Sequence, residues 1–185
     1  MPHDQEAAEL WVAFKRGDKA AYGSLVKMFY KTLFSYGTKF SADIAVVEDC
    51  IQDLFLEIWQ RREFLSDTEH VKFYLLKSLR RKIHHELNQL QSRQYDSLDD
   101  KQTLDFLGEF SIETTLIEIE TAELHRKKLH QILAKLTKRE REVIYLKFYQ
   151  DMDYEQIAGM MSINYQSVRN LVHTAIRELK KAWFQ

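Results

Sequence analysis

The segment VEDCIQDLFLEIW, residues 47–59, combines an apolar stripe with a charged face. At 3.6 residues per helical turn, four apolar side chains share one side: Val47, Ile51, Leu54 and Ile58. Acidic and amide side chains fall largely off that side: Glu48, Asp49, Gln52, Asp53 and Glu57. Phe55 and Trp59 stand beside these charges, a mixture common where a helix docks onto another protein. The segment therefore predicts a helix with one face in a core and another available to a partner, and a plain amphipathic helix in a bundle fits this window equally well.

The chain of 185 residues has few of the residues that punctuate strands and turns. It contains 5 glycines and its only proline is Pro2, which favours helices throughout. This length suits one large domain or two small ones. The single cysteine, Cys50, excludes an internal disulfide framework and stands among apolar residues, so we expect a buried thiol in a reducing compartment.

The N-terminal sequence MPHDQEAAEL lacks the basic start and apolar run of a secretion signal. No later stretch approaches the ~18 consecutive apolar residues that a membrane span requires. We therefore expect a cytoplasmic protein without membrane insertion.

Charge is segregated along the chain, although the net charge is only −1. Between residues 95 and 123 a single lysine, Lys101, accompanies the acidic residues Asp96, Asp99, Asp100, Asp105, Glu109, Glu113, Glu118, Glu120 and Glu123. Basic residues flank this stretch: Lys72, Lys77, Arg80, Arg81, Lys82 and Arg93 before it, and Arg126, Lys127, Lys128, Lys135, Lys138, Arg139 and Arg141 after it. Two basic modules around an acidic linker are expected when the modules contact phosphate and the connector avoids it. Solvated helix faces explain any one cluster, but they explain the segregation less well.

The first module predicts helices over about residues 4–17, 19–39, 43–62 and 68–92. Ser66 and Glu69 have the spacing of an S-x-x-E capping box, which predicts that the last helix begins there. That helix interleaves aromatic residues with basic ones, including Phe73, Tyr74 and Lys77. Rings beside cations suit single-stranded DNA, because base stacking and phosphate attraction act together. A single ring is more often a core residue, so this function requires at least one ring at the surface.

The C-terminal block predicts three helix starts, at Thr137 with Glu140, at Asp153 with Gln156, and at Asn164. Residues 154–161 and 165–181, joined by residues 162–164, have the proportions of a helix-turn-helix. The outer face of its second helix carries polar side chains suited to base edges and phosphates in a major groove.

The D-x-x-Q-D-x-F-x-x-x-W run beginning at Asp49 resembles the polymerase-binding helix of bacterial sigma factors, in particular the extracytoplasmic-function group of the sigma-70 family. The aromatic and basic helix after it resembles the sigma domain that melts and reads the minus-ten promoter element. The helix-turn-helix block resembles the domain that binds the minus-thirty-five element. The resemblance covers nearly the entire chain, and it implies an all-α fold of two small helical domains. These are residues 1–95 and residues 123–185, the second a helix-turn-helix, joined by an acidic linker at 96–122.

The resemblance also implies a function and partners. We expect a sigma factor that binds core RNA polymerase and directs promoter-specific transcription initiation in response to an extracytoplasmic or stress signal. Its partners would be core polymerase and promoter DNA, both duplex and melted, and many relatives are held inactive by an anti-sigma factor. No cofactor, catalytic residue or metal ligand is expected.

Three sets of site residues follow from the resemblance. The polymerase-binding set is Asp49, Gln52, Asp53, Phe55, Ile58 and Trp59. The minus-ten set, within a loop at 64–70 that shapes a pocket for a flipped base and the helix after it, is Phe64, His70, Lys72, Phe73, Tyr74, Lys77, Arg80, Arg81 and His84. The minus-thirty-five set is Lys138, Arg139, Gln166, Ser167, Arg169, Asn170, His173, Thr174 and Arg177.

Three positions depart from the family's pattern. Arg81 stands where an asparagine usually follows the arginine, which changes the base contacts expected there. Ser162 stands where the turn often has glycine, and a short polar side chain can adapt to a turn. Thr174 replaces a common arginine and would alter sequence preference.

Two other classes of protein share parts of these patterns. A response-regulator transcription factor also ends in L-T-x-R-E-x-E-V and a helix-turn-helix, but its receiver domain needs alternating strands, which the first half does not predict. A metal enzyme is the other class, because the chain has seven histidines. However, His84 and His85 are adjacent, whereas helical ligands to one ion prefer spacings such as i, i+4. His125 and His130 are five apart, and with no glycine-rich phosphate loop or nucleophile elbow we expect no enzyme activity.

Overall fold

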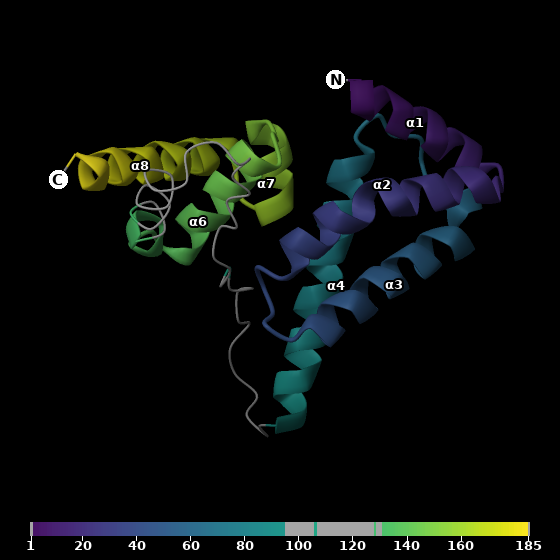
Figure 1. Cartoon of the computed structure of the whole chain (residues 1–185), viewed down its shortest axis with the longest axis horizontal. Coiled ribbons are helices and arrows are strands. Elements are labelled where there is room, and N and C mark those ends of the chain that lie inside the picture. Colours follow the sequence, from purple (N-terminus) through teal and green to yellow (C-terminus); the bar gives the residue numbers. More distant parts are fainter. Residues whose placement is uncertain (1, 95–105, 107–127, 129–130, 185) are drawn as a thin grey trace, which may run out of the picture. The chain divides into compact units, whose positions relative to one another are not determined.

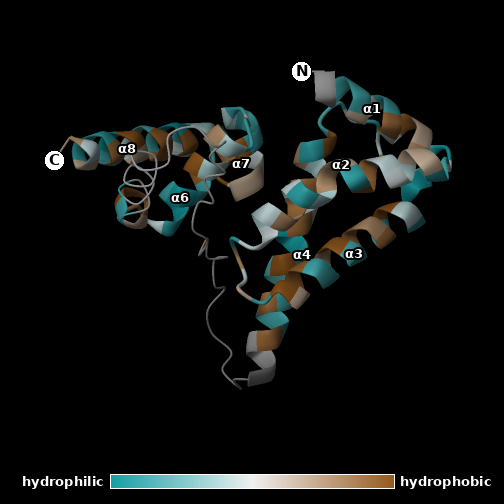
Figure 2. Ribbon diagram, in the orientation of Figure 1, coloured by the Kyte–Doolittle hydropathy of each residue, from teal (hydrophilic) through white to brown (hydrophobic). Residues whose placement is uncertain are grey.

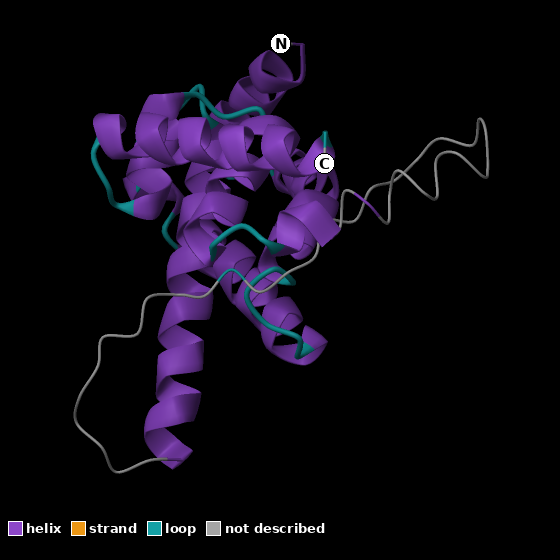
Figure 3. Ribbon diagram, turned by 90° about the vertical axis from the view of Figure 1, so that its left-hand side faces the viewer, coloured by secondary structure: helices purple, strands orange, loops and turns teal. Residues whose placement is uncertain are grey.

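The computed structural model describes residues 2–94, 106, 128 and 131–184. Its contacts divide the chain into two compact units, Met1–Leu104 and Asp105–Gln185. Every element in the described residues is a helix, which confirms the predicted all-α fold class (Figure 3). Of the predicted acidic linker, residues 96–122, only Phe106 is described. None of the helices described is both long enough and apolar enough to cross a bilayer.

Most of the described part of the first unit is helical (Figure 1). Its elements are α1 (Pro2–Lys15), α2 (Lys19–Gly37), α3 (Ile44–Gln60), the short 3-10 turn η1 (Arg62–Phe64) and α4 (Val71–Gln94). Asp18 and Asp43 cap α2 and α3, because each carboxylate accepts hydrogen bonds from the first backbone N–H groups of its helix. Both α2 and α4 pack against each of the other three long helices of this unit.

Apolar side chains from all four helices share one core. Its largest members are Trp11, Phe14, Leu25, Leu33, Tyr36, Phe40, Ile51, Leu54, Leu75 and Leu76. The four residues of the apolar stripe predicted in 47–58 are all buried, and hydrophobic and hydrophilic residues alternate along α3 accordingly (Figure 2). The Cys50 thiol is buried as predicted, and burial, together with the nearby Glu86 and Asp53 carboxylates, raises its pKa to about 11. This thiol therefore remains protonated at neutral pH.

The long helix α4 begins later than its sequence predicts. It starts at Val71, and residues 65–70 form a loop rather than a first helical turn. The predicted capping box of Ser66 and Glu69 is therefore wrong. The Ser66 carbonyl instead accepts a hydrogen bond from the Trp11 indole, and the His70 amide donates to Thr68 Oγ1 at 3.0 Å.

The second unit contains the predicted helix-turn-helix. Its elements are α6 (Lys138–Ile144), a π-helical turn η2 (Tyr145–Tyr149), α7 (Tyr154–Met161) and α8 (Tyr165–Trp183). The predicted capping boxes that begin α6 and α7 are confirmed, with both reciprocal hydrogen bonds present in each. The Asn164 side chain accepts from Ser167 N–H at 2.7 Å, which confirms the predicted cap of α8. Helix α8 packs against α6 and α7.

Phe106, inside the stretch predicted as linker, is a core residue of the second unit. It is buried, and its ring lies 5.6 Å from that of Tyr145, centroid to centroid. Tyr145 stacks in turn on Tyr149 at 5.4 Å and accepts a hydrogen bond from the Gln150 side chain. Phe106, although it stands among acidic residues in the sequence, therefore packs in the core of the C-terminal unit.

The turn between α7 and α8 depends on a residue in a left-handed conformation. Ser162, the C-cap of α7, has φ 55° and ψ 43°, and its N–H donates to the carbonyl of Ala158. The left-handed conformation costs a residue with a Cβ about 1–2 kcal/mol, which is why glycine is common at such positions. The predicted tolerance of serine at this turn thus carries a local energetic cost.

At Gly37 the backbone of α2 lies close to Val47 of α3 and Ile83 of α4, so substitution there should be costly. A Cβ there would lie 2.6 Å from Val47 Cγ1 and 3.3 Å from Ile83 Cδ1, whereas one at Gly23 meets nothing within 4 Å. We expect Gly37→Ala to lower the free energy of unfolding by about 1–3 kcal/mol. The matched control Gly23→Ala should raise it by about 0.5–1 kcal/mol. Urea titration of both variants is the measurement, and equal effects would contradict the close approach.

Replacing Ser162 by glycine should stabilise the second unit. Relief of the left-handed strain should raise the free energy of unfolding, with about 1 kcal/mol as the upper bound, because glycine also gains entropy when unfolded. Thermal unfolding followed by circular dichroism measures the change. Ser162→Ala is the control and should not stabilise, since alanine keeps the Cβ; a gain in both variants would assign the effect to loss of the hydroxyl.

Candidate functional site

The outer face of α3 carries a continuous exposed stripe, which we call the α3 stripe: Asp49, Gln52, Asp53, Leu56 and Gln60. These positions follow one another at helical spacing on the side opposite the buried residues. Leu56 is 53% exposed, so the stripe places a large apolar side chain directly beside two carboxylates and two amides. Leu56 is absent from the predicted polymerase-binding set, although its i, i+3 spacing from Asp53 is visible in the sequence.

Three predicted contact residues on α3 lie elsewhere. Phe55 is 5% and Ile58 2% exposed, so their side chains belong to the core and have no surface to offer a partner. Their place in the predicted polymerase-binding set is therefore corrected. Trp59 is half-buried. The centre of its ring lies 4.9 Å from the centre of the Tyr22 ring and also 4.9 Å from Arg62 Cζ. Its main contacts are internal.

Glu57, at the edge of the α3 stripe, forms an ion pair that links α3 to α4. Its carboxylate lies 2.9 Å from Lys82 Nζ on α4 and 3.1 Å from Arg61 Nη1. The hydrogen bond from Lys82 is the main cause that holds the pKa of Glu57 below its usual value. Because this carboxylate is neutralised internally, the free negative charge of the α3 stripe comes from Asp49 and Asp53.

The loop at 65–70 and the start of α4 present aromatic and basic side chains together. Phe64, at the entrance to the loop, is 84% exposed, so its ring is accessible from solvent. Phe73 is half-buried, and Lys77 Nζ lies 5.3 Å from the centre of its ring. Tyr74 is also half-buried and packs edge-on against Trp11 at 5.2 Å.

The remaining residues of the minus-ten set are spread along the loop and α4. His70 and Arg81 are exposed, and Lys72, Arg80 and His84 are partly exposed. The Arg80 guanidinium lies 5.9 Å from the ring of Phe40, and a ring nitrogen of His84 lies 3.3 Å from Asn88 Nδ2. All nine predicted residues thus keep some surface, in contrast to the α3 set.

Helix α8 exposes the predicted polar face. Gln166, Arg169, Asn170, His173 and Arg177 are exposed on it, and Ser167 and Thr174 are partly exposed. Gln166 Nε2 donates to Asn170 Oδ1 at 3.0 Å, which fixes one amide against the other. The Asn170 amide keeps donor hydrogens for a further partner.

A groove of about 410 Å³ runs between α6 and α8. It brings together four predicted residues: Arg139, Ser167, Asn170 and Thr174. Ile163 and Leu171 also line it. Apolar side chains beside hydrogen-bonding ones suit a base edge that carries a methyl group. Lys138, the other predicted α6 residue, is exposed at the start of that helix.

Two parts of the chain match known protein families. Residues 25–93 match the family described as sigma-70 region 2, and residues 126–179 match the family described as sigma-70, region 4. The chain belongs to the sigma-70 family. As a sigma factor it is similar to the ECF RNA polymerase sigma factor SigL of Mycobacterium tuberculosis, with 28% identity over 170 residues, 89% of this chain and 92% of SigL. The predicted membership of the extracytoplasmic-function group is confirmed.

Solved structures share the fold of this sigma factor. CnrH, in a complex with the cytosolic domain of CnrY, is 18% identical with a TM-score of 0.61, over 95% of this chain and 96% of that one. The sigma factor RpoE of Bartonella quintana, in a complex with the anti-sigma factor NepR, is 15% identical with a TM-score of 0.59. That match spans 88% of this chain and 96% of RpoE.

The function predicted from the sequence is confirmed. This sigma factor binds core RNA polymerase and promoter DNA and directs transcription initiation. Its family consists of non-enzymatic transcription regulators. The α3 stripe and α4 as far as residue 93 lie within the region 2 match, and α7 with α8 as far as residue 179 lies within the region 4 match. Helix α1 precedes both.

Proposed function

We propose that this sigma factor divides its work among three surfaces. The α3 stripe docks on core polymerase, the 65–70 loop with α4 holds the unpaired minus-ten strand, and α8 reads the minus-thirty-five duplex. The observation that carries the proposal is the α3 stripe, because it is the exposed face of the helix whose opposite face forms the core of the region 2 unit.

The composition of the α3 stripe supports its assignment to polymerase. Interface centres combine an apolar anchor with polar groups that fix orientation. Leu56 supplies the anchor, and the carboxylates of Asp49 and Asp53 supply charge on either side of Gln52. Trp59 contributes by holding the C-terminal end of α3 in place against Tyr22 rather than by direct contact.

The surface of the 65–70 loop and α4 suits single-stranded DNA. The exposed ring of Phe64 can stack on a base, and Phe73 with Lys77 offers a ring and a cation at neighbouring positions. Arg81, exposed at the position where the family has asparagine, adds a cation for phosphate.

The protein acts in the cytoplasm, where polymerase and promoter DNA are found, without enzymatic activity or a cofactor of its own. An anti-sigma factor holds it inactive until an extracytoplasmic or stress signal arrives. The solved complex of the sigma factor RpoE with the anti-sigma factor NepR supports this regulation, since RpoE shares the fold of this chain.

Substitutions on the α3 stripe should weaken binding to core polymerase. Asp53→Ala and Leu56→Ala each remove an exposed group whose loss at an interface centre costs about 2 kcal/mol, roughly 30-fold in affinity. Fluorescence anisotropy with purified bacterial core enzyme measures the affinity. Glu9→Ala, an exposed carboxylate on α1, is the control and should bind as wild type. Wild-type affinity in both stripe variants would remove the α3 stripe from the interface.

Substitutions on α8 should separate base contacts from phosphate contacts. Arg169→Ala and Asn170→Ala should each weaken binding to the cognate minus-thirty-five duplex by about 1–3 kcal/mol and relax preference at one base pair. Lys138→Ala should weaken all sequences alike and lower the salt slope by about one unit. A uniform loss for Arg169→Ala across scrambled duplexes would make it a phosphate contact instead.

The division between two DNA-binding units predicts a strict dependence on promoter spacing. Both elements must lie on suitable faces of the duplex, whose groove completes a turn every ~10.5 base pairs. Inserting about five base pairs between the two elements should therefore abolish initiation in a defined transcription assay, and inserting none is the control. Undiminished initiation after the insertion would contradict two-element recognition. It would favour a helix-turn-helix regulator that binds one compact site.

A further inference from the structure

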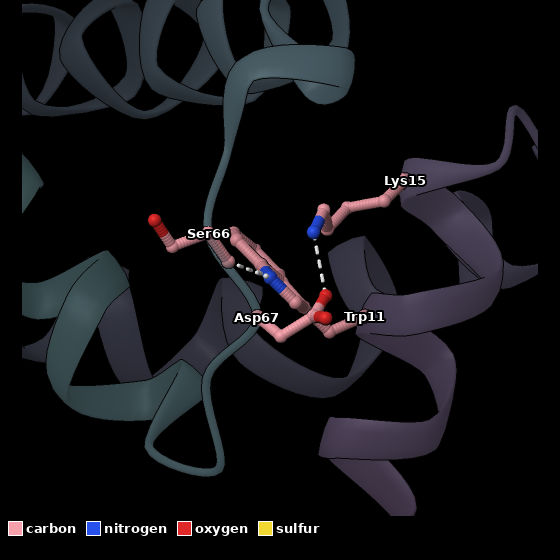
Figure 4. A network of polar contacts seen from close by, with 4 residues as sticks. All are labelled: Trp11, Lys15, Ser66 and Asp67. Carbon is pink, nitrogen blue, oxygen red and sulfur yellow. Dashed lines mark hydrogen bonds and ion pairs between the residues drawn. The ribbon is translucent and has the colours of Figure 1, made fainter.

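Helix α1 holds the 65–70 loop by two side chains one helical turn apart (Figure 4). The Trp11 indole Nε1 donates a hydrogen bond to the Ser66 carbonyl at 3.1 Å. Lys15 Nζ lies 2.5 Å from Asp67 Oδ1 and forms an ion pair with it. Two consecutive loop residues are therefore attached to a helix that lies more than 50 residues earlier in the sequence.

Trp11 connects the loop to α4 as well as to α1. Its side chain is 1% exposed, with its ring 5.3 Å from that of Phe14 and 5.2 Å from that of Tyr74. Because Tyr74 belongs to the first turn of α4, one buried ring touches both parts of the predicted strand-binding surface. A shift of α1 would therefore change the contacts of both the loop and α4.

The loop depends on such attachments because it is not helical. Residues 65–70 lie between η1 and α4, and the Thr68 side chain accepts a local hydrogen bond from the His70 amide. A groove of about 880 Å³ separates the loop from α1, lined on one side by residues such as Ala8 and Val12 and on the other by residues 67–70. Any movement of the loop away from α1 changes the width of this groove.

We propose that Trp11 and Lys15 are positioning residues that hold the 65–70 loop in the conformation that captures the unpaired promoter strand. The proposal rests on the proposed function of this loop. Binding a strand to an ordered loop avoids the entropy cost of ordering it at the moment of binding. The Trp11 hydrogen bond and the Lys15–Asp67 ion pair order the loop when the protein folds, so its entropy is already lost before the strand binds.

The α3 stripe lies on a different helix, so the proposal separates strand capture from polymerase binding. Loss of the Lys15–Asp67 pair should weaken strand binding without weakening the affinity for core enzyme. Lys15 is the cleaner of the two positions to change, because it lies on α1 and is only partly exposed, whereas Asp67 lies in the loop and is exposed.

The test compares the assembled holoenzyme of wild type, Lys15→Gln and Trp11→Phe. The probe is a fluorescein-labelled single-stranded oligonucleotide carrying the non-template minus-ten sequence of a promoter used in vitro. Lys15→Gln should weaken oligonucleotide binding by about 2–5-fold with core affinity unchanged, an effect of the size of a partly exposed charge pair. Trp11→Phe, which keeps a ring but removes the N–H donor, should weaken it further. Lys19→Gln, an exposed lysine at the start of α2, is the matched control and should bind as wild type.

A charge exchange separates positioning from direct contact. Lys15→Asp alone should impair oligonucleotide binding, and combining it with Asp67→Lys should restore part of the loss by rebuilding the pair in reverse. Wild-type binding by Lys15→Gln overturns the proposal. A parallel loss of core affinity and thermal stability also overturns it, because the contacts would then only support the fold. If wild-type holoenzyme fails to bind the oligonucleotide at all, the assignment of the loop to the strand fails, and this proposal with it.

Discussion

Val47, Ile51 and Leu54 are buried between α2 and α4, and this burial fixes which residues of α3 remain at the surface. A helix rotated by one residue, about 100°, would turn the carboxylates of Asp49 and Asp53 toward the core, where unpaired charges are very costly. The core therefore determines the surface. Gly37 reinforces the same constraint, because the backbone of α2 approaches Val47 too closely for a side chain to intervene.

The second unit obeys a similar rule on a smaller scale. Val168, Val172 and Ala175 bury one side of α8, and the polar residues predicted to contact DNA occupy the other side. Capping fixes where each helix begins, so the Asn164 cap sets the register with which α8 presents Asn170. The strained Ser162 conformation completes the turn that brings α7 against α8.

Local patterns in the sequence predicted the helices, the two confirmed capping boxes and the helix-turn-helix, because periodicity and cap chemistry act over a few residues. Contacts between distant residues were not predictable in this way. The Trp11 indole reaches Ser66 across 55 positions, and the loop it stabilises replaces the predicted capping box. Phe55 was misassigned because an aromatic residue beside charges fits an interface and a core equally well, and only packing against Tyr22 distinguishes the two. Phe106 was not predicted as a core residue, because the acidic residues around it indicated a linker.

A sigma factor that directs polymerase to particular promoters must change where transcription begins. This can be measured by transcribing fragmented genomic DNA with purified bacterial core polymerase, with and without the protein, and sequencing the transcript 5′ ends. The protein should add a small set of start sites that share two upstream elements at a fixed spacing. An identical set of start sites with and without the protein would contradict it.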